Sequence, residues 1–158
     1  METDVSLSVS DAGELLTLQR AAYVTEGQAH HDLRLPPLIQ SLDELTTELS
    51  DPSVVAFGLR DSRWRLVAAV RVNIDCAKEI AVLGRLVVAP DLQGRGLGSR
   101  LLELVEQRLS TEVVELQLFT GEHSAGNLRL YARFGYRETH RTLTPGGYAL
   151  VHLSKPLR

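Results

Sequence analysis

Residues 86–109, which read LVVAPDLQGRGLGSRLLELVEQRL, form the stretch that decides the fold. Its apolar start is typical of a strand end, and glycines follow at alternate positions, 94, 96 and 98. Apolar side chains then recur at helical spacing at Leu97, Leu101, Leu104, Val105 and Leu109. The pattern predicts a strand, a glycine-rich turn and an amphipathic helix, in that order.

The turn from Gln93 to Ser99 predicts a binding site for an anion. The first N–H groups of a helix have no intrahelical acceptor and lie at the positive end of the helix dipole. Glycines let such amides approach phosphate oxygens without an intervening Cβ, and Arg95 adds a charged donor. For any one of these glycines, the alternative interpretation is a tight turn that needs a positive φ.

Two nucleotide-binding motifs also contain glycine-rich turns, and neither fits. The dinucleotide fingerprint counted from Gly94 requires a third glycine where Ser99 stands, and Glu122 lies too far along the chain to be its ribose-binding acid. The P-loop requires a G-K-[ST] sequence, which does not follow the turn. Both mismatches weaken these two interpretations of the turn.

The segments on either side predict an α/β chain of order β-α-α-β-β-β-α-β-α-β-β. Strands are expected at 5–9, 54–60, 64–74, 79–88, 113–120, 137–143 and 148–154, and helices at 11–26, 41–49, 97–109 and 125–134. Asp11 with Glu14, and Ser41 with Glu44, have the spacing of helix-capping pairs. The two prolines in 30–40 favour an irregular loop there. We expect a mixed, mostly antiparallel sheet flanked by helices on both faces.

Composition indicates one domain over residues 1–158. The chain has a mass of 17.4 kDa and is 44% hydrophobic and 23% charged, enough for a core without disulfides. Its one cysteine, Cys76, excludes a disulfide framework and a thiolate metal cluster, which favours the cytoplasm. Acids near Met1 and the lack of a long apolar run argue against export and membrane insertion.

Charge is distributed unevenly along the chain. A net charge of −3 argues against binding nucleic acid through basic surface alone. Residues 1–50 hold nine acids against two bases, whereas residues 51–158 hold eleven acids against fifteen bases. This asymmetry suits a cationic ligand near the first third and an anionic one near the rest; scattered surface charge is the alternative.

Two blocks of residues carry a resemblance to a known family. Val88-Ala89-Pro90 followed by Gln93 to Gly98 resembles the acetyl-CoA motif of the GNAT superfamily of N-acetyltransferases, V-x-P followed by Q/R-x-x-G-x-G/A. Asn127 and Tyr131, in a helix ending F-G-Y, resemble the second block of that family. The resemblance implies acetyl-CoA as co-substrate and direct transfer of the acetyl group to a primary amine in a ternary complex.

The resemblance also implies roles for individual residues. The implied cofactor-binding residues are Leu86, Val87, Val88, Gln93, Gly94, Arg95, Gly96, Leu97, Gly98, Ser99, Asn127 and Tyr131. The backbone N–H of Val88 is expected to polarise the thioester carbonyl, and Tyr131 to donate a proton to the departing thiolate. Asn127 and Tyr131 are four residues apart, which puts both side chains on one helix face. From spacing alone, Tyr131 is equally interpretable as a core aromatic.

The general base is not visible in the sequence. Many family members place a carboxylate on the strand before V-x-P, but here the nearest positions are Leu83, Gly84 and Arg85. The remaining candidates are a water chain and four side chains, Glu26, His30, His31 and Glu122. Glu26 and His30 are also our candidates for binding the acceptor. The adjacent His30 and His31 lack a third ligand for a metal and are more typical of a solvated loop.

The sequence does not identify the acceptor either. We expect residues 23–40 to shape its site, and the turn 145–147 to line the pocket or a homodimer contact. The acids of the first helices favour a small cationic amine, with a protein or peptide amine as the alternative. A non-catalytic acyl-CoA-binding module and, more remotely, a nicotinamide-dependent oxidoreductase remain as rival functions.

Overall fold

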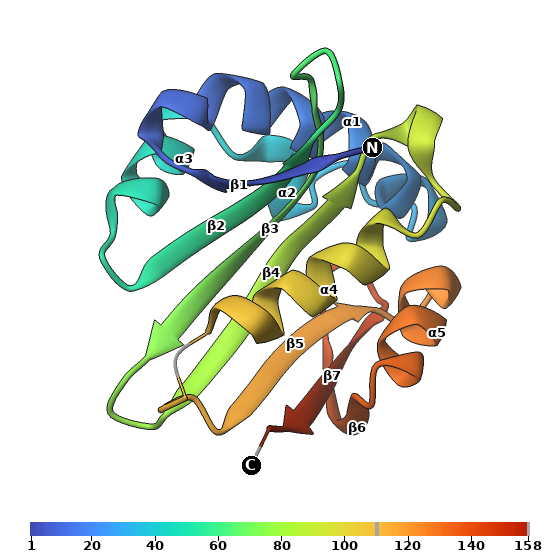
Figure 1. Ribbon diagram of the computed structural model, residues 1–158. Coiled ribbons are helices and arrows are strands. Elements are labelled where there is room, and N and C mark those ends of the chain that lie inside the picture. Colours follow the sequence, from blue (N-terminus) through green and yellow to red (C-terminus); the bar gives the residue numbers. More distant parts are fainter. Residues whose placement is uncertain (110, 158) are drawn as a thin grey trace.

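The computed structural model describes residues 1–109 and 111–157, and these residues build one seven-stranded sheet flanked by helices (Figure 1). The strands are β1 (Thr3–Leu7), β2 (Val54–Arg60), β3 (Leu66–Asp75), β4 (Ile80–Val88), β5 (Glu115–Gly121), β6 (Arg137–Leu143) and β7 (Ala149–Pro156). The helices are α1 (Ala12–Ala29), α2 (Pro36–Ile39), α3 (Leu42–Ser50), α4 (Leu97–Arg108) and α5 (Ala125–Arg133), with 3-10 turns at Val9–Asp11 and Pro90–Leu92.

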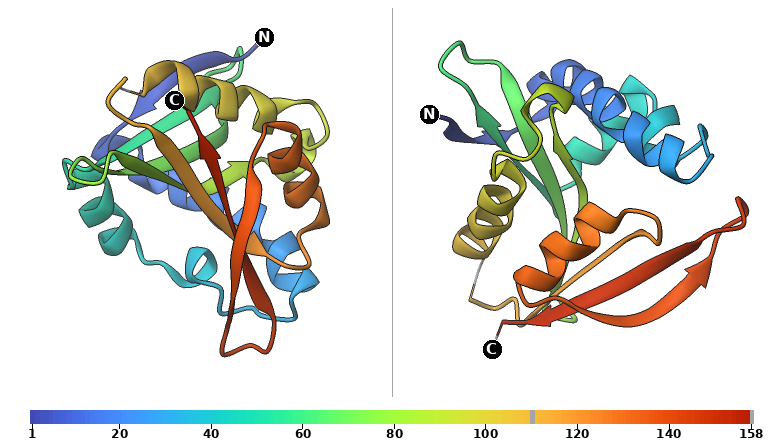
Figure 2. Two further views of the ribbon diagram at one scale, coloured as in Figure 1. Left: turned by 90° about the horizontal axis from the view of Figure 1, so that it is seen from below. Right: turned by 90° about the vertical axis from the view of Figure 1, so that its right-hand side faces the viewer.

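The sheet has the order β1-β2-β3-β4-β5-β7-β6. Every neighbouring pair is antiparallel except β4 and β5, which are parallel because α4 crosses between them. Helices cover both faces, with α1 and α3 on one face and α4 on the other (Figures 1 and 2). The predicted fold class and the meander of 54–88 are therefore confirmed.

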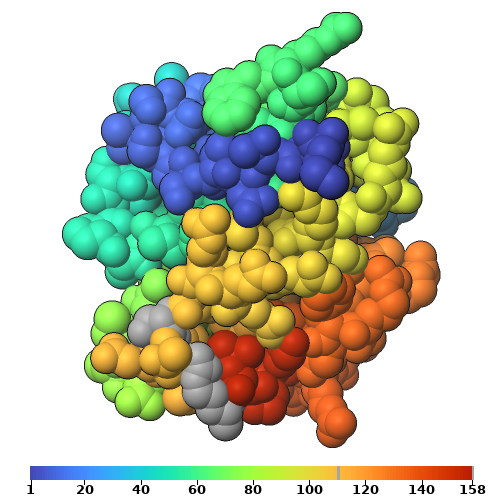
Figure 3. All heavy atoms as spheres, in the orientation of Figure 1, coloured from blue at the N-terminus to red at the C-terminus, as the bar shows by residue number. Residues whose placement is uncertain are grey.

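The core has two parts, one on each side of the sheet. Leucines of α4, such as Leu101 and Leu104, pack on one face, and leucines of α1, such as Leu15 and Leu18, pack on the other. Both sets recur at helical spacing, so one stripe of each helix is buried. Figure 3 shows β1 beside α4, where Arg100 forms ion pairs with Glu2 at 3.0 Å and with Asp4 at 3.2 Å.

Strands β4 and β5 separate after a short paired region. They are hydrogen-bonded only from Ile80 to Val82, opposite Glu115 to Gln117, and then diverge (Figure 1). On the other side of β4 the register with β3 shifts between Gly84 and Val87, so that Arg85 and Leu86 form a bulge; Arg85 has a φ of 55°. A bulge bends the strand that carries it, and the two strands open into a V.

Two local predictions were wrong. Pro36 and Pro37 begin α2 rather than preventing a helix, because proline is well suited to the first helical turn, where no N–H bond is required. Asp11 and Glu14 do not cap α1: their carboxylates bind Arg60, at 3.1 and 2.8 Å. The capping box of Ser41 and Glu44 is confirmed, with both reciprocal hydrogen bonds present.

The remaining element boundaries differ from the predicted ones by a few residues, and α1 runs on to Ala29. In the part of the chain that the structure describes, we find no helix with the length and apolar character needed to cross a membrane.

Candidate active site

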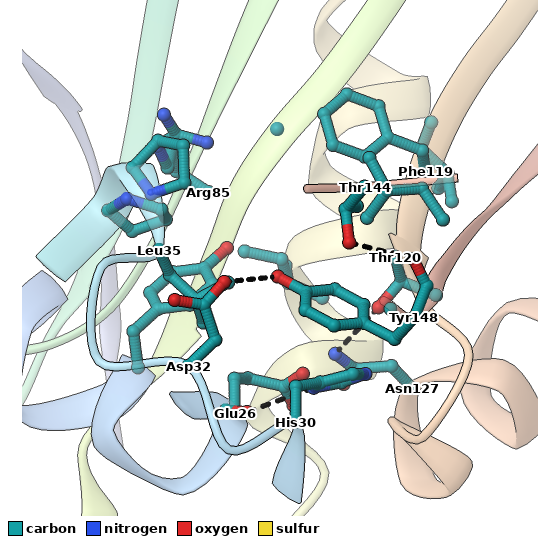
Figure 4. A pocket seen from close by; sticks show the side chains of 18 of the residues that line it. Glu26, His30, Asp32, Leu35, Arg85, Phe119, Thr120, Asn127, Thr144 and Tyr148 are labelled. Atoms are coloured by element: carbon teal, nitrogen blue, oxygen red, sulfur yellow. Dashed lines mark hydrogen bonds between the residues drawn. The ribbon is translucent and has the colours of Figure 1, made fainter. Parts of the chain in front are cut away.

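A cavity of about 710 Å³ lies between the diverging ends of β4 and β5 (Figure 4). Leu102 of α4 lines it, together with five other parts of the chain. They are the end of α1 with α2 (23–37), β4 (83–86), β5 (118–121), α5 (127 and 131) and the β6–β7 hairpin (144–150). A largely apolar cleft of this size that also contains a few convergent polar groups is typical of a small-molecule site.

The predicted site residues divide between this pocket and the glycine-rich turn. Leu86, Asn127 and Tyr131 line the pocket, and so do Glu26 and His30. Pro145 and Gly146 also line the pocket, which was one of the two positions expected for the turn 145–147.

The other predicted residues lie outside the pocket lining. Val87 is buried in the core beneath α1, and Val88 packs against the core beneath α4. His31 is exposed, and the carboxylate of Glu122 accepts the backbone N–H of Ala149. His31 and Glu122 are therefore poor candidates for a base that acts inside the pocket.

The turn from Gln93 to Ser99 begins α4 with two left-handed residues. Gly94 has a φ of 78° and Gly96 a φ of 80°, and Gly96 is the N-cap of α4. A Cβ added at either glycine would meet nothing within 4 Å, so backbone conformation rather than crowding selects glycine here. Residues from Gln93 to Gly96 are exposed, Leu97 is buried, and Gly98 and Ser99 are half-buried. The turn can therefore present its amides to an anion from solvent.

Helix α5 connects the turn to the pocket. A Cβ at Gly98 would lie 3.1 Å from the Leu130 side chain, so α4 and α5 approach closely at this point. One residue further along α5, Tyr131 lines the pocket, and Asn127 does so one turn earlier. The turn and the pocket thus lie close enough for one elongated ligand to occupy both.

Tyr131 is almost fully buried in the pocket wall, with 5% of its surface exposed. Burial raises the pKa of its phenol above the ordinary value, and the nearby Tyr23, Tyr136 and Glu26 raise it further. The hydroxyl therefore keeps its proton throughout the neutral and mildly alkaline range. A protonated phenol at the end of a ligand channel can act as an acid.

His30 is a buried structural residue and not part of a solvated loop, which corrects the sequence-based interpretation. It is 6% exposed, and its ring packs on Tyr148 with centroids 4.5 Å apart. Its Nδ1–H donates to the Glu26 carbonyl at 2.9 Å, while Nε2 accepts the backbone N–H of His123 at 3.0 Å. Both ring nitrogens are occupied, so His30 cannot accept a proton without breaking one of these bonds.

No sequence signal reveals this role of His30, because its partner His123 is 93 residues away. Gly121 is part of the same arrangement, since a Cβ there would lie only 2.2 Å from the His30 ring. Glu26, by contrast, keeps a carboxylate at the pocket wall, where it accepts a hydrogen bond from the Ser124 hydroxyl.

A second feature that the sequence does not reveal closes one side of the pocket. The Tyr148 hydroxyl, on the β6–β7 hairpin, donates to the Asp32 carboxylate at 2.8 Å across 116 residues of sequence (Figure 4). Burial and this hydrogen bond raise the pKa of Tyr148 to about 12, and the same bond lowers the pKa of Asp32. We call this contact the Asp32–Tyr148 clasp.

Comparisons with known proteins place these features in context. A family model described as an acetyltransferase (GNAT) domain matches residues 38–157. A search of curated protein sequences found no significant match.

Solved structures with a similar fold include the ribosomal-protein-S18-alanine N-acetyltransferase from Escherichia coli, with a TM-score of 0.81 and 21% identity over 99% of this chain and 94% of that one. The PaiA N-acetyltransferase from Thermoplasma acidophilum, in complex with coenzyme A, has a TM-score of 0.75 and 18% identity over 99% of both chains. A spermidine N-acetyltransferase chimera of SpeG from Vibrio cholerae and hSSAT has a TM-score of 0.76 and 18% identity over 98% of this chain and 95% of that one.

Proposed function

Because the chain belongs to the acetyltransferase (GNAT) family, we propose that it transfers the acetyl group of acetyl-CoA directly to a primary amine of a small molecule within a ternary complex. The observation that carries this proposal is the junction of an exposed amide-rich turn with a pocket that contains a buried tyrosine. The turn suits a diphosphate and the pocket suits a thioester with its acceptor. The exposed free thiol of Cys76 suits a reducing compartment and supports a cytoplasmic location.

The turn would hold the diphosphate of acetyl-CoA. Backbone amides between Gly94 and Ser99 converge at the start of α4, and the exposed Arg95 adds a positive charge. Amides at a helix N-terminus bind phosphate oxygens with no side chain between them. Asn127 and Leu86, on the facing walls of the pocket, would contact the rest of the carrier.

The Val88 amide is a suitable donor to the thioester carbonyl. The N–H of the next residue, Ala89, donates to the Val67 carbonyl of β3 at 2.8 Å. Backbone N–H groups alternate in direction along a strand, so the Val88 N–H points away from β3, to the side where β5 has diverged. A fixed amide there would stabilise the negative charge that develops on the carbonyl oxygen during attack.

The proton transfers can be assigned to two side chains. An alkyl ammonium must lose a proton before it attacks, and the Glu26 carboxylate at the pocket wall can bind it and accept that proton directly or through water. The amine nitrogen then forms a bond to the acetyl carbon, the carbon–sulfur bond breaks, and Tyr131 protonates the thiolate. The net reaction yields the acetamide, free coenzyme A and one proton.

Enclosure of the pocket favours a small acceptor over a protein. The Asp32–Tyr148 clasp joins the hairpin to the segment before α2, and both elements line the cavity. A folded protein would have to displace this contact to reach Tyr131.

The test is release of free thiol from acetyl-CoA across a panel of small amines, peptides and aminoglycosides, together with calorimetric binding of acetyl-CoA. We expect turnover with at least one small amine. Tight binding without turnover on any member would identify a non-catalytic binding module, and turnover of peptides alone would assign a protein acceptor.

Substitutions at Gly96 test where the cofactor binds. Gly96→Glu should abolish acetyl-CoA binding, because a carboxylate would occupy and repel the diphosphate site. Gly96→Ala is the matched control, since it has the same strain at a φ of 80° without the charge. It should retain binding. If Gly96→Glu binds acetyl-CoA as tightly as the unchanged protein, the cofactor lies elsewhere.

A further inference from the structure

Arg85 presents an unsatisfied guanidinium at the wall of the pocket (Figure 4). Its Nε is sealed from solvent and has no hydrogen-bond partner among residues 1–109 and 111–157. Over the same residues, no carboxylate forms an ion pair with its side chain. Arg85 as a whole is half-buried, but a buried N–H donor without a partner is costly, so its presence in the wall of a cavity indicates a missing acceptor.

The backbone holds Arg85 in this position. It occupies the bulge of β4 with a φ of 55°, a conformation that non-glycine residues adopt rarely. Arg71, which lines a second cleft together with Arg85, forms an ion pair with Glu48. Burial lowers the pKa of Arg71, and the nearby charge of Arg85 lowers it further. Within the described residues, the carboxylate of Glu48 thus forms its ion pair with Arg71 and none with Arg85.

The opposite sign of charge lies on the α1 side of the same cavity. Tyr23 is close enough to both Arg85 and Glu26 for each charge to affect it, and all three residues line the pocket. Within the described residues, neither Glu26 nor Asp32 forms an ion pair. The β4 wall of the cavity thus carries Arg85, whereas the wall from α1 to α2 carries Glu26, Asp32 and a second arginine, Arg34, none of them in an ion pair within the described residues.

We propose that Arg85 binds a carboxylate of the acceptor, so that the substrate is an amino acid with an apolar side chain. This proposal rests on the proposed function and refines it. A guanidinium binds a carboxylate through two parallel hydrogen bonds, and this geometry fixes the orientation of the ligand. The amine of such a substrate faces Glu26, and its side chain contacts the apolar wall formed by Leu35, Leu83 and Phe119.

The experiment compares leucine, methionine and phenylalanine with their primary amides as acceptors. The amide has nearly the shape of the acid but carries no negative charge. Its amine also has a lower pKa, so basicity alone would favour the amide as the acceptor. We expect kcat/KM to be at least about tenfold higher for the acids, because a hydrogen-bonded charge pair is lost with the amide. Arg85→Gln should lower kcat/KM about 10- to 100-fold on the acids and leave the amides within about twofold.

Two further variants make the result specific. Arg85→Lys retains the positive charge but not the planar guanidinium. Its kcat/KM on the acids should lie between those of the unchanged enzyme and of Arg85→Gln. Arg34→Gln removes the other arginine of the pocket wall and should preserve the preference for acids. Equal turnover of acids and amides by the unchanged enzyme, or loss of the preference in Arg34→Gln instead of Arg85→Gln, would overturn the proposal while acetyl transfer itself stands.

A binding measurement separates this proposal from the proposed function. N-acetylleucine and N-acetylleucinamide are titrated into the enzyme in the presence of coenzyme A by calorimetry, which requires no turnover. We expect only the acid to bind, and only while Arg85 is present. Arg85-dependent binding without any acetyl transfer would refute the function and retain the carboxylate site, whereas no binding of the acid refutes the site.

Discussion

Tyr131 is a buried tyrosine in the wall of the pocket, unlike an ordinary surface tyrosine. Its spacing from Asn127 predicts a shared helix face, and both side chains do line one cavity. Burial raises the pKa of its phenol, which suits a group that must arrive at the reaction with its proton in place.

Tyr131→Phe should slow turnover and leave the affinity for acetyl-CoA unchanged. General acids contribute roughly 10²- to 10⁴-fold to rates, and a thiolate is a tolerable leaving group, so we expect a fall in kcat near 10²-fold. Steady-state kinetics with calorimetry would measure both quantities. Tyr136→Phe is the matched control, because this buried phenol packs edge-on against Tyr131 but lies outside the pocket lining.

The same pKa shift predicts the pH profile. A raised pKa keeps Tyr131 protonated as pH increases. At any pH below about 10, the ordinary pKa of tyrosine, ionisation of this phenol should therefore not reduce kcat. The rate should instead rise with pH as the acceptor amine loses its proton, and then level off. A fall in kcat between pH 8 and 9 that disappears in Tyr131→Phe would contradict this assignment.

Individual residues also show where sequence reasoning stops. Gly94 and Gly96 could be assigned a left-handed turn from sequence because the constraint is local. The burial of His30 could not be predicted from sequence, since its packing partner Tyr148 comes from another part of the chain. The same is true of Arg85, whose lack of a partner is a property of the assembled cavity.

At the scale of elements, one of the two predicted capping pairs forms and the other does not. The Ser41 and Glu44 pair caps α3 as its spacing predicts. Asp11 and Glu14 have the spacing of such a pair, yet both bind Arg60, which lies 49 and 46 residues away. A buried guanidinium competes successfully for these carboxylates because leaving it unpaired would be costly.

The cap of α3 provides a stability test. Ser41→Ala removes the acceptor for the Glu44 N–H, 3.1 Å away, and should lower the free energy of unfolding by about 1 kcal/mol. For a chain of this size that corresponds to a fall of about 2–4 °C in Tm. Ser50→Ala removes a hydroxyl at the other end of the same helix and should change stability by less than about 0.5 kcal/mol. Equal losses in both variants, measured by urea denaturation, would exclude a capping contribution.

Across the whole molecule, the uneven distribution of charge along the sequence serves the fold more than it serves a ligand. Acids of the first 50 residues bind bases from the rest of the chain, as in the ion pairs of Arg60 with Asp11, Arg71 with Glu48 and Arg100 with Glu2. These pairs attach α1, α3 and β1 to the central sheet and to α4. The acids left for an acceptor are the few at the pocket, above all Glu26.

The Asp32–Tyr148 clasp couples two walls of the pocket that are 116 residues apart in sequence, and Tyr148→Phe tests it. The substitution removes the hydroxyl that bridges the hairpin to the segment before α2, while the ring can still pack on His30. We expect amide hydrogen exchange to become faster at 143–149 and 31–36, and the KM for the acceptor to rise roughly 2- to 10-fold, as for one lost hydrogen bond. The KM for acetyl-CoA should not change, because the turn that we propose as its diphosphate site lies outside this contact.

Asp32→Asn is the matched variant for the clasp, since the amide oxygen can still accept from Tyr148 without carrying a charge. Burial and Asp32 raise the pKa of Tyr148 to about 12, so the hydroxyl remains a donor at neutral pH in both the unchanged protein and this variant. If the hydrogen bond closes the pocket, Asp32→Asn should retain slow exchange in the hairpin and Tyr148→Phe should not. If Asp32→Asn opens the hairpin and Tyr148→Phe does not, the charge of Asp32 rather than the bond holds these walls together.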